Sequence, residues 1–91
     1  MQETNILLVE DDRMIIENLT EFLKTEGFQV WSADGQEKAM KILRNQHFDL
    51  ILLDITLAQG NGYSTCTQIK SHYEIPIIFL TALDDEFSVV T

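Results

Sequence analysis

The chain has 91 residues, 45% of them hydrophobic, and its 15 acidic against 6 basic residues give a formal charge of −9. This length fits one small domain, and the acidic balance argues against direct nucleic-acid binding, which needs a basic face. The single cysteine, Cys66, excludes a disulfide within the chain and is expected to be a small buried core residue. No apolar run reaches transmembrane length and no signal-peptide pattern begins the chain, so we expect a cytoplasmic protein without a membrane partner.

Short apolar runs then alternate with helical stretches. The run Asn5–Val9 predicts a buried strand, followed by a helix that Asp12 caps and that Gly27 ends. Residues 28–33 predict a second strand. The apolar face of the first helix is expected to contain Ile15, Ile16, Leu19, Phe22 and Leu23.

The pattern continues in the second half of the chain. Asp34 and Glu37 fit a capping box at the start of a second helix, and residues 49–54 form the most apolar predicted strand. Residues 60–62 predict a loop, and Pro76 precedes a fourth strand over Ile77–Leu80. Residues 84–90 are expected to begin a fourth helix. The weaker apolar stripe of the third helix is expected to contain Tyr63, Cys66, Ile69 and Tyr73.

Strands separated by helices indicate βαβ units and a parallel sheet. Three of the strands are apolar on both sides, so helices must cover both faces of the sheet. We therefore expect an α/β, flavodoxin-like, doubly wound sheet of strand order 2-1-3-4. In this order the first and third strands are neighbours at the point of reversal, where such folds bind ligands.

Polar residues stand where the apolar strands end. Glu10, Asp11 and Asp12 follow the first strand, Asp54 ends the third and Thr81 follows the fourth. The carboxyl ends of parallel strands meet at one edge of a sheet, where clustered carboxylates repel one another unless a cation joins them. The sequence therefore predicts a metal-dependent site at this edge.

Three segments together resemble the receiver domain of two-component response regulators. They are residues 6–12 (ILLVEDD), residues 49–54 (DLILLD) with Leu57 and Gly62 after them, and residues 76–82 (PIIFLTA). The resemblance extends over residues 5–86. It implies a phosphorylation-controlled signalling switch and a chain that is no enzyme beyond self-phosphorylation and slow self-dephosphorylation.

The resemblance also assigns the site residues. Asp54 corresponds to the aspartate that accepts a phosphoryl group from a histidine kinase, and Mg²⁺ is the expected cofactor. Asp11 corresponds to the direct metal ligand, Glu10 to an acid that binds through water, and Thr56 to the residue whose backbone carbonyl completes the ligands. Thr81 matches the hydroxyl that contacts the phosphoryl group and transmits its presence to an effector.

Further expectations concern the surroundings of the site. The backbone N–H of Ala82 is expected to contact the phosphoryl group, while Asp12 is assigned to the helix cap. The effector lies outside this chain in the family and often binds DNA, which would make the protein a transcription regulator. His47 and His72 fall near predicted helix ends, where a favourable contact with the helix dipole is favoured over metal binding.

The sequence departs from the family in two respects. Ala58 stands where proline is common in the family. The family's lysine at the end of a fifth strand is also missing, and no other lysine can replace it because none follows an apolar strand: Lys24, Lys38, Lys41 and Lys70. We therefore expect residues 1–91 to be a receiver domain that lacks its fifth βα unit. The Ile77–Leu80 strand would then be an apolar sheet edge, available for dimer formation or domain exchange.

Two other functions remain open. One is a receiver-like binding module that works without phosphate, which Mg²⁺ titration would separate from a working site. The other is a phosphohydrolase with an aspartyl-phosphate intermediate. It would need a second aspartate two residues after Asp54, where Thr56 stands.

Overall fold

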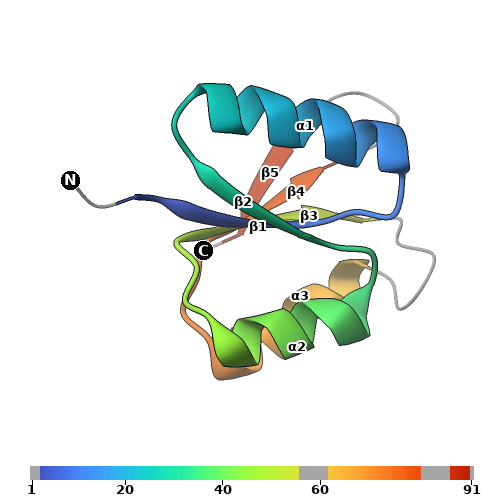
Figure 1. Cartoon of the computed structure of the whole chain (residues 1–91). Helices are drawn as coiled ribbons and strands as arrows, with labels where there is room; N and C mark the ends of the chain where they lie inside the picture. The colour runs from blue at the N-terminus through green and yellow to red at the C-terminus, as the bar shows by residue number, and fades with distance from the viewer. Residues whose placement is uncertain (1–2, 56–61, 81–86, 91) are drawn as a thin grey trace.

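The computed structural model describes residues 3–55 and 62–80, and the backbone of 87–90. Four parallel strands lie in the order 2-1-3-4, with α1 over one face and α2 and α3 over the other (Figure 1). This arrangement confirms the predicted doubly wound fold. The elements are β1 (Asn5–Val9), α1 (Arg13–Thr25), β2 (Gln29–Ala33), α2 (Gln36–Asn45), β3 (Leu50–Asp54), α3 (Gly62–His72), β4 (Ile77–Leu80) and β5 (Phe87–Val90).

The end of the described chain differs from the prediction. Phe87–Val90 form the strand β5, which pairs antiparallel with β4 so that Phe87 lies opposite Leu80. The prediction of a helix over residues 87–90 is therefore wrong. The prediction that β4 is an unpaired sheet edge, on which dimer formation or domain exchange depended, is wrong as well. The β-branched pair Val89 and Val90 favours a strand, and β4 offers backbone groups for it to pair with. Residues 84–86 lie outside the described part.

Both ends of α1 are built as predicted. Asp12 is the N-cap, and its side chain accepts hydrogen bonds from the backbone N–H groups of Met14 at 2.9 Å and Ile15 at 3.3 Å. Gly27 has a φ of 98°, a left-handed conformation that ends the helix just after the C-cap residue Glu26. Local signals therefore determine this helix.

The start of α2 corrects the predicted capping box. The helix begins at Gln36, with Gly35 as an N-cap in extended conformation and no side-chain hydrogen bond at the cap. Asp34 thus stands one residue too early to be the N-cap. Gln36, at the start of α2, links this helix to α3, because its side chain donates a hydrogen bond to Gln68 and accepts one from Thr65.

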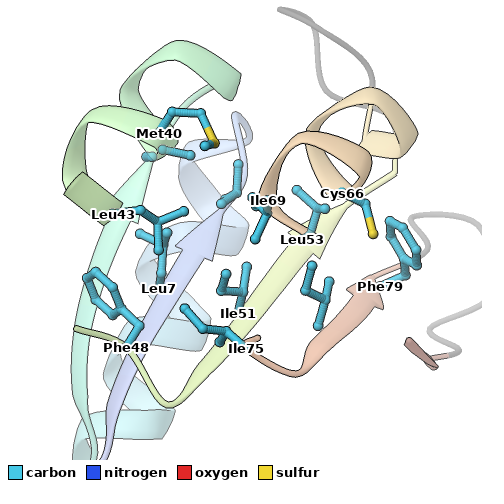
Figure 2. Close-up of a cluster of buried hydrophobic side chains, with 14 residues drawn as sticks. Leu7, Met40, Leu43, Phe48, Ile51, Leu53, Cys66, Ile69, Ile75 and Phe79 are labelled. Carbon is cyan, nitrogen blue, oxygen red and sulfur yellow. The ribbon is translucent and has the colours of Figure 1, made fainter. Parts of the chain in front are cut away.

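Two hydrophobic clusters hold the layers together. The larger one lies between the sheet and the helices α2 and α3, where Leu7, Ile51 and Leu53 face Leu43 and Ile69 (Figure 2). The smaller one lies under α1 and contains Ile6, Leu8, Leu52 and Leu80. Burial of this apolar surface is the main stabilising term of the fold.

Three predicted core residues can be compared with this packing. Cys66 is buried, as expected. Phe22 and Tyr63 are not, because 58% and 63% of their surfaces are exposed, although the Tyr63 ring contacts Phe79 with centroids 5.5 Å apart. The apolar stripe of each helix is thus narrower than its sequence pattern.

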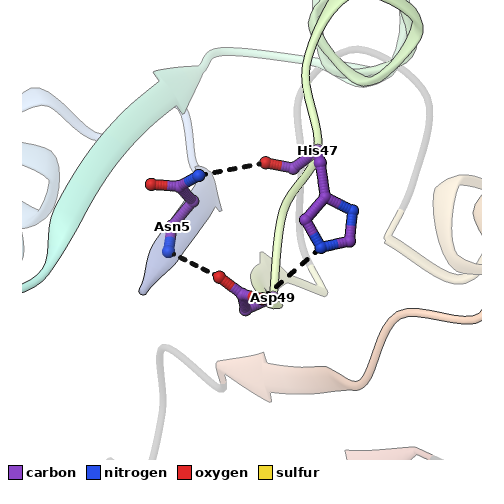
Figure 3. A network of polar contacts seen from close by, with 3 residues as sticks. All are labelled: Asn5, His47 and Asp49. Carbon is purple, nitrogen blue, oxygen red and sulfur yellow. Dashed lines mark hydrogen bonds and ion pairs between the residues drawn. The ribbon is translucent and has the colours of Figure 1, made fainter. Parts of the chain in front are cut away.

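A polar network joins the amino ends of β1 and β3 (Figure 3). The Asn5 backbone N–H donates to Asp49 at 2.8 Å, and the Asn5 amide donates to the His47 carbonyl at 3.3 Å. His47 Nε2 also lies 3.4 Å from the Asp49 carboxylate, so this histidine contacts a carboxylate at a strand entry and not a metal-ligand set. Within the described residues, no helix is long and apolar enough to cross a membrane.

Candidate phosphoacceptor and metal site

The site lies where β1 and β3 end side by side. The two strands are parallel neighbours, and Val9 pairs with Leu53. The next residue along each strand is an acid, Glu10 after β1 and Asp54 at the end of β3. The pairing register therefore places these two carboxylates level with each other at the carboxyl edge of the sheet.

Three carboxylates gather at this point. Glu10, Asp11 and Asp54 each offer an oxygen, and these oxygens all lie within 4.8 Å of one another. Glu10 is 2% exposed and Asp54 is 4% exposed, whereas Asp11 is exposed to solvent. The group thus has two buried members and one member at the surface, from which a ligand can approach.

Glu10 is held in place by the backbone of the loop after β1. One of its carboxylate oxygens accepts hydrogen bonds from the N–H groups of Asp11 at 2.9 Å and Asp12 at 3.1 Å. The same loop starts α1 through the Asp12 cap. The position of the Glu10 carboxylate is therefore determined by the turn from strand to helix.

Burial and mutual repulsion make it unfavourable for all carboxylates of this site to be ionised at once. The pKa of Glu10 is raised to about 7, chiefly by burial and also by the hydrogen bond and charge of Asp54, although the N–H groups of Asp12 and Asp11 act in the opposite direction. Two carboxylates so close cannot both ionise freely in a buried place. A cation or a shared proton would relieve the repulsion.

The donor set fits Mg²⁺. This ion prefers oxygen ligands and usually takes one or two carboxylates together with water and phosphate oxygens. The chain supplies one accessible and two buried carboxylates, with an approach from solvent on the Asp11 side. The predicted acids Glu10, Asp11 and Asp54 are thus together, whereas Thr56, Thr81 and Ala82 lie outside the described residues.

Gly62 is a part of the site that sequence reasoning placed in a loop. It is the first residue of α3, it is buried, and its N–H donates to the Ile55 carbonyl at 3.0 Å. A Cβ at this position would lie 2.5 Å from the Asp54 carbonyl oxygen and 2.5 Å from Ile55 Cα. Only glycine lets α3 begin so close to the backbone of the candidate phosphoacceptor. The sequence feature that pointed to Gly62 was its place among the segments that resemble a receiver domain.

Lys70 can be placed as well. Its ammonium donates to the carbonyl of Ile75 at 3.3 Å, just before β4 begins. That position is at the amino edge of the sheet, whereas Asp54 is at the carboxyl edge. Lys70 therefore does not take the place of the family's phosphate-binding lysine, in agreement with the prediction.

Comparison with known proteins agrees with this geometry. The response regulator receiver domain family matches residues 6–91. The chain is 40% identical over 86 residues to the transcriptional regulatory protein AfsQ1 of Streptomyces coelicolor, a match covering 94% of this chain and 38% of that protein. It is 37% identical over 90 residues to the probable transcriptional regulator ycf27 of Cyanidium caldarium, covering 99% of this chain and 36% of that protein.

A solved structure gives the same result. The BeF3-activated N-terminal receiver domain of Klebsiella pneumoniae RstA superposes with a TM-score of 0.84 at 28% identity, over 91% of this chain and 71% of that one. The chain spans little more than a third of the length of the two curated relatives. With the fold, the acidic site and the family match in agreement, the chain belongs to the response regulator receiver domain family.

Proposed function

We propose that this chain is a phosphorylation-controlled signalling switch in which Asp54 accepts a phosphoryl group from a histidine kinase. The observation that carries the proposal is the position of Asp54, buried at the end of β3 with its carboxylate within 4.8 Å of those of Glu10 and Asp11. Membership of the receiver family supports it. The related Klebsiella domain is described as BeF3-activated, which is consistent with a phosphoryl mimic acting on this fold.

The reaction needs a nucleophile and neutralisation of charge. A carboxylate oxygen of Asp54 attacks the phosphorus of a phosphohistidine, the P–N bond breaks as the P–O bond forms, and the histidine takes up a proton. Phosphoryl transfer depends mainly on positioning and electrostatic stabilisation. Bound Mg²⁺ would supply the positive charge for the phosphoryl oxygens.

The chain's own residues have distinct proposed roles. Asp11, exposed at the mouth of the cluster, would bind the ion directly, and Glu10 would hold a water of its coordination shell. The backbone carbonyl of Thr56 would complete the protein ligands. Thr81 and the N–H of Ala82 would contact the phosphoryl group, and movement of Thr81 would report it to an effector.

The effector that this switch would control belongs to a longer protein. The curated relatives are transcriptional regulators of which this chain matches little more than a third. We infer that residues 1–91 are the receiver part of such a regulator, that the effector is outside them and that it binds DNA. The chain itself, with a formal charge of −9, is not expected to bind nucleic acid directly.

Phosphoryl incorporation from acetyl phosphate tests the proposal. Intact-protein mass spectrometry should show one added phosphoryl group when Mg²⁺ is present and none after chelation. Asp54→Asn should abolish the signal. Asp49→Asn is the matched control, because Asp49 stands at the opposite end of the same strand and contacts Asn5 and His47 instead.

Two results would contradict the proposal. Phosphorylation of Asp54→Asn to the level of the unchanged protein would place the acceptor elsewhere. Mg²⁺ binding without phosphoryl uptake, in a protein that includes the residues after Thr91, would favour a binding module that works without phosphate. Steady release of phosphate from small phosphate esters would instead indicate a phosphohydrolase.

A further inference from the structure

The outer edge of β2 is a second feature of the molecule, separate from the acidic site. β2 ends the sheet, and within the described part of the chain it pairs with β1 alone. The Gln29 N–H donates to the Thr4 carbonyl at 2.9 Å, and the Ala33 carbonyl accepts from the Glu10 N–H at 2.9 Å. Successive residues of a parallel strand direct their backbone groups to opposite sides. Gln29, Trp31 and Ala33 therefore pair with β1, while the N–H and C=O groups of Val30 and Ser32 point away from the sheet.

An open groove flanks this edge on each face. On the α1 face a groove of about 630 Å³ is lined by Val30 and Ser32 together with Glu17, Glu21 and Lys24 of the helix. The side chains of alternate strand residues lie on opposite faces. The groove on this face thus runs beside the same two residues whose backbone groups point outward.

The second groove, on the α2 face, has a volume of about 580 Å³. Its floor is Trp31, whose ring stands edge-on to Phe48 with centroids 5.6 Å apart. The helix contributes Lys38, Lys41 and Glu37 to its wall. The β2 edge thus has outward-pointing backbone groups and a groove on each face of the sheet. The alternating side chains of an added strand could enter these two grooves in turn.

We propose that the β2 edge is a docking site for an extended segment of another protein, which adds to the sheet as a strand and inserts successive side chains into the two grooves. In strand addition the backbone hydrogen bonds give affinity and the alternating pockets give specificity. Val30 and Ser32 supply two donors and two acceptors for the added strand. The site does not involve Asp54, because β1 lies between β2 and β3, the strand that ends at Asp54.

The charges of the grooves define the segment. The α1 groove has two acids, Glu17 and Glu21, against Lys24, so it favours a basic side chain. The α2 groove has two lysines, Lys38 and Lys41, against one acid, so it favours an acidic side chain. Because neighbouring residues of a strand point to opposite faces, the segment carries a basic and an acidic residue at adjacent positions.

A second copy of this chain does not fit these requirements. Its own β2, Gln29–Ala33, contains no charged residue, so it would bring no complementary side chain to either groove. Each copy also has a formal charge of −9, which opposes self-association. The occupant is therefore a different polypeptide.

Two blocked peptides of identical composition test the proposal on the intact protein. Thr-Val-Lys-Asp-Val-Thr directs its charges to opposite faces in any register, whereas Thr-Lys-Val-Asp-Val-Thr directs both to one face. Trp31 is the only tryptophan and reports on the α2 groove directly through its fluorescence. We expect the first peptide to bind about tenfold more tightly than the second.

Amide exchange identifies the mode of binding. The first peptide should slow the exchange of the Val30 and Ser32 amides, and should leave the Gln29, Trp31 and Ala33 amides, already paired with β1, nearly unchanged. A version of this peptide with methylated backbone nitrogens should not bind. Equal affinity of the two permuted peptides, or binding without this alternation of protected amides, would overturn the proposal.

Charge reversal supplies the matched variants. Combining Lys38→Glu with Lys41→Glu should weaken binding of the first peptide by about tenfold. Arg44→Glu is the control, since Arg44 is exposed on the same helix and does not line the groove. An equal loss with Arg44→Glu would show a general charge effect. Protection of Val30 and Ser32 that needs no peptide and rises with protein concentration would indicate a second copy, and would equally overturn the proposal.

Discussion

Gly62 lies against the backbone of Asp54, so closely that a Cβ on Gly62 would come within 2.5 Å of the Asp54 carbonyl oxygen. The start of α3 and the end of β3 are thus in direct contact, and the N–H of Gly62 donates to the Ile55 carbonyl. The helix start, and not only the strand, positions the candidate phosphoacceptor.

Gly62→Ala should therefore disturb the site and the fold together. The added methyl group has no space, so either α3 or the backbone at Asp54 must shift, at a cost of about 1–3 kcal/mol. Urea unfolding measures the stability, and phosphoryl incorporation from acetyl phosphate measures the site; both should fall.

Gly27→Ala is the matched comparison. Gly27 has a φ of 98° but nothing within 4 Å of an added Cβ, so the change should cost about 1 kcal/mol through backbone conformation alone. Phosphoryl incorporation should be retained. If both alanine variants lost the same activity, the contact between Gly62 and Asp54 would not be the cause.

The raised pKa of Glu10 predicts how stability depends on pH without metal. Its pKa is raised from 4.5 to about 7 in the folded protein, so between these values the folded state binds more protons than the unfolded state. The contribution of Glu10 to the free energy of unfolding is full below about 4.5 and is lost as the pH rises through about 7. It amounts to roughly 3 kcal/mol at most.

Glu10→Gln isolates this contribution from those of the other acids. The amide keeps the shape of the side chain but does not titrate, so the fall in stability with rising pH should become shallower. Urea denaturation curves at several pH values measure the difference. Added Mg²⁺ should stabilise the unchanged protein most at pH values above about 7, where Glu10 is ionised. An identical pH dependence in the two proteins would contradict the assignment.

Asp12 should act as a helix cap and not as a metal ligand. Its side chain accepts the N–H bonds of Met14 and Ile15, so Asp12→Ala should lower stability by about 1 kcal/mol, whereas Asp12→Asn should retain the cap. Thermal unfolding tests the stability, and calorimetric titration tests Mg²⁺ affinity. A large loss of Mg²⁺ affinity in Asp12→Asn would show that its carboxylate takes part in binding the ion.

Replacing Thr20 or Thr65 by valine should have opposite effects on the stability of the protein. Among the described residues, no partner accepts or donates a hydrogen bond at the buried Thr20 hydroxyl, so Thr20→Val should leave stability unchanged or raise it by up to about 1 kcal/mol. The fully buried Thr65 donates to the Gln36 amide oxygen at 3.2 Å. Thr65→Val should therefore lower stability by about 1 kcal/mol. Chemical denaturation of both variants measures the contrast.

The sequence by itself predicted most of the helices and strands and named the candidate acids of the site. Strands, helices and caps are local features, so the apolar run of β1, the Asp12 cap and the left-handed Gly27 could be predicted from neighbouring residues. Because the carboxyl ends of parallel strands meet at one edge, the sequence also predicted that Glu10, Asp11 and Asp54 lie together, as they do in the structure.

Only the tertiary structure decided how these parts meet. The close approach of Gly62 to Asp54 joins α3 to β3, and the burial and raised pKa of Glu10 depend on the pairing of β1 with β3. The strand β5 pairs with the edge of β4, although a helix was expected to begin in residues 84–90. The periodicity of a sequence shows which residues of one segment are apolar. The distance between Gly62 and Asp54, the burial of Glu10 and the pairing of β5 with β4 depend on contacts between different segments.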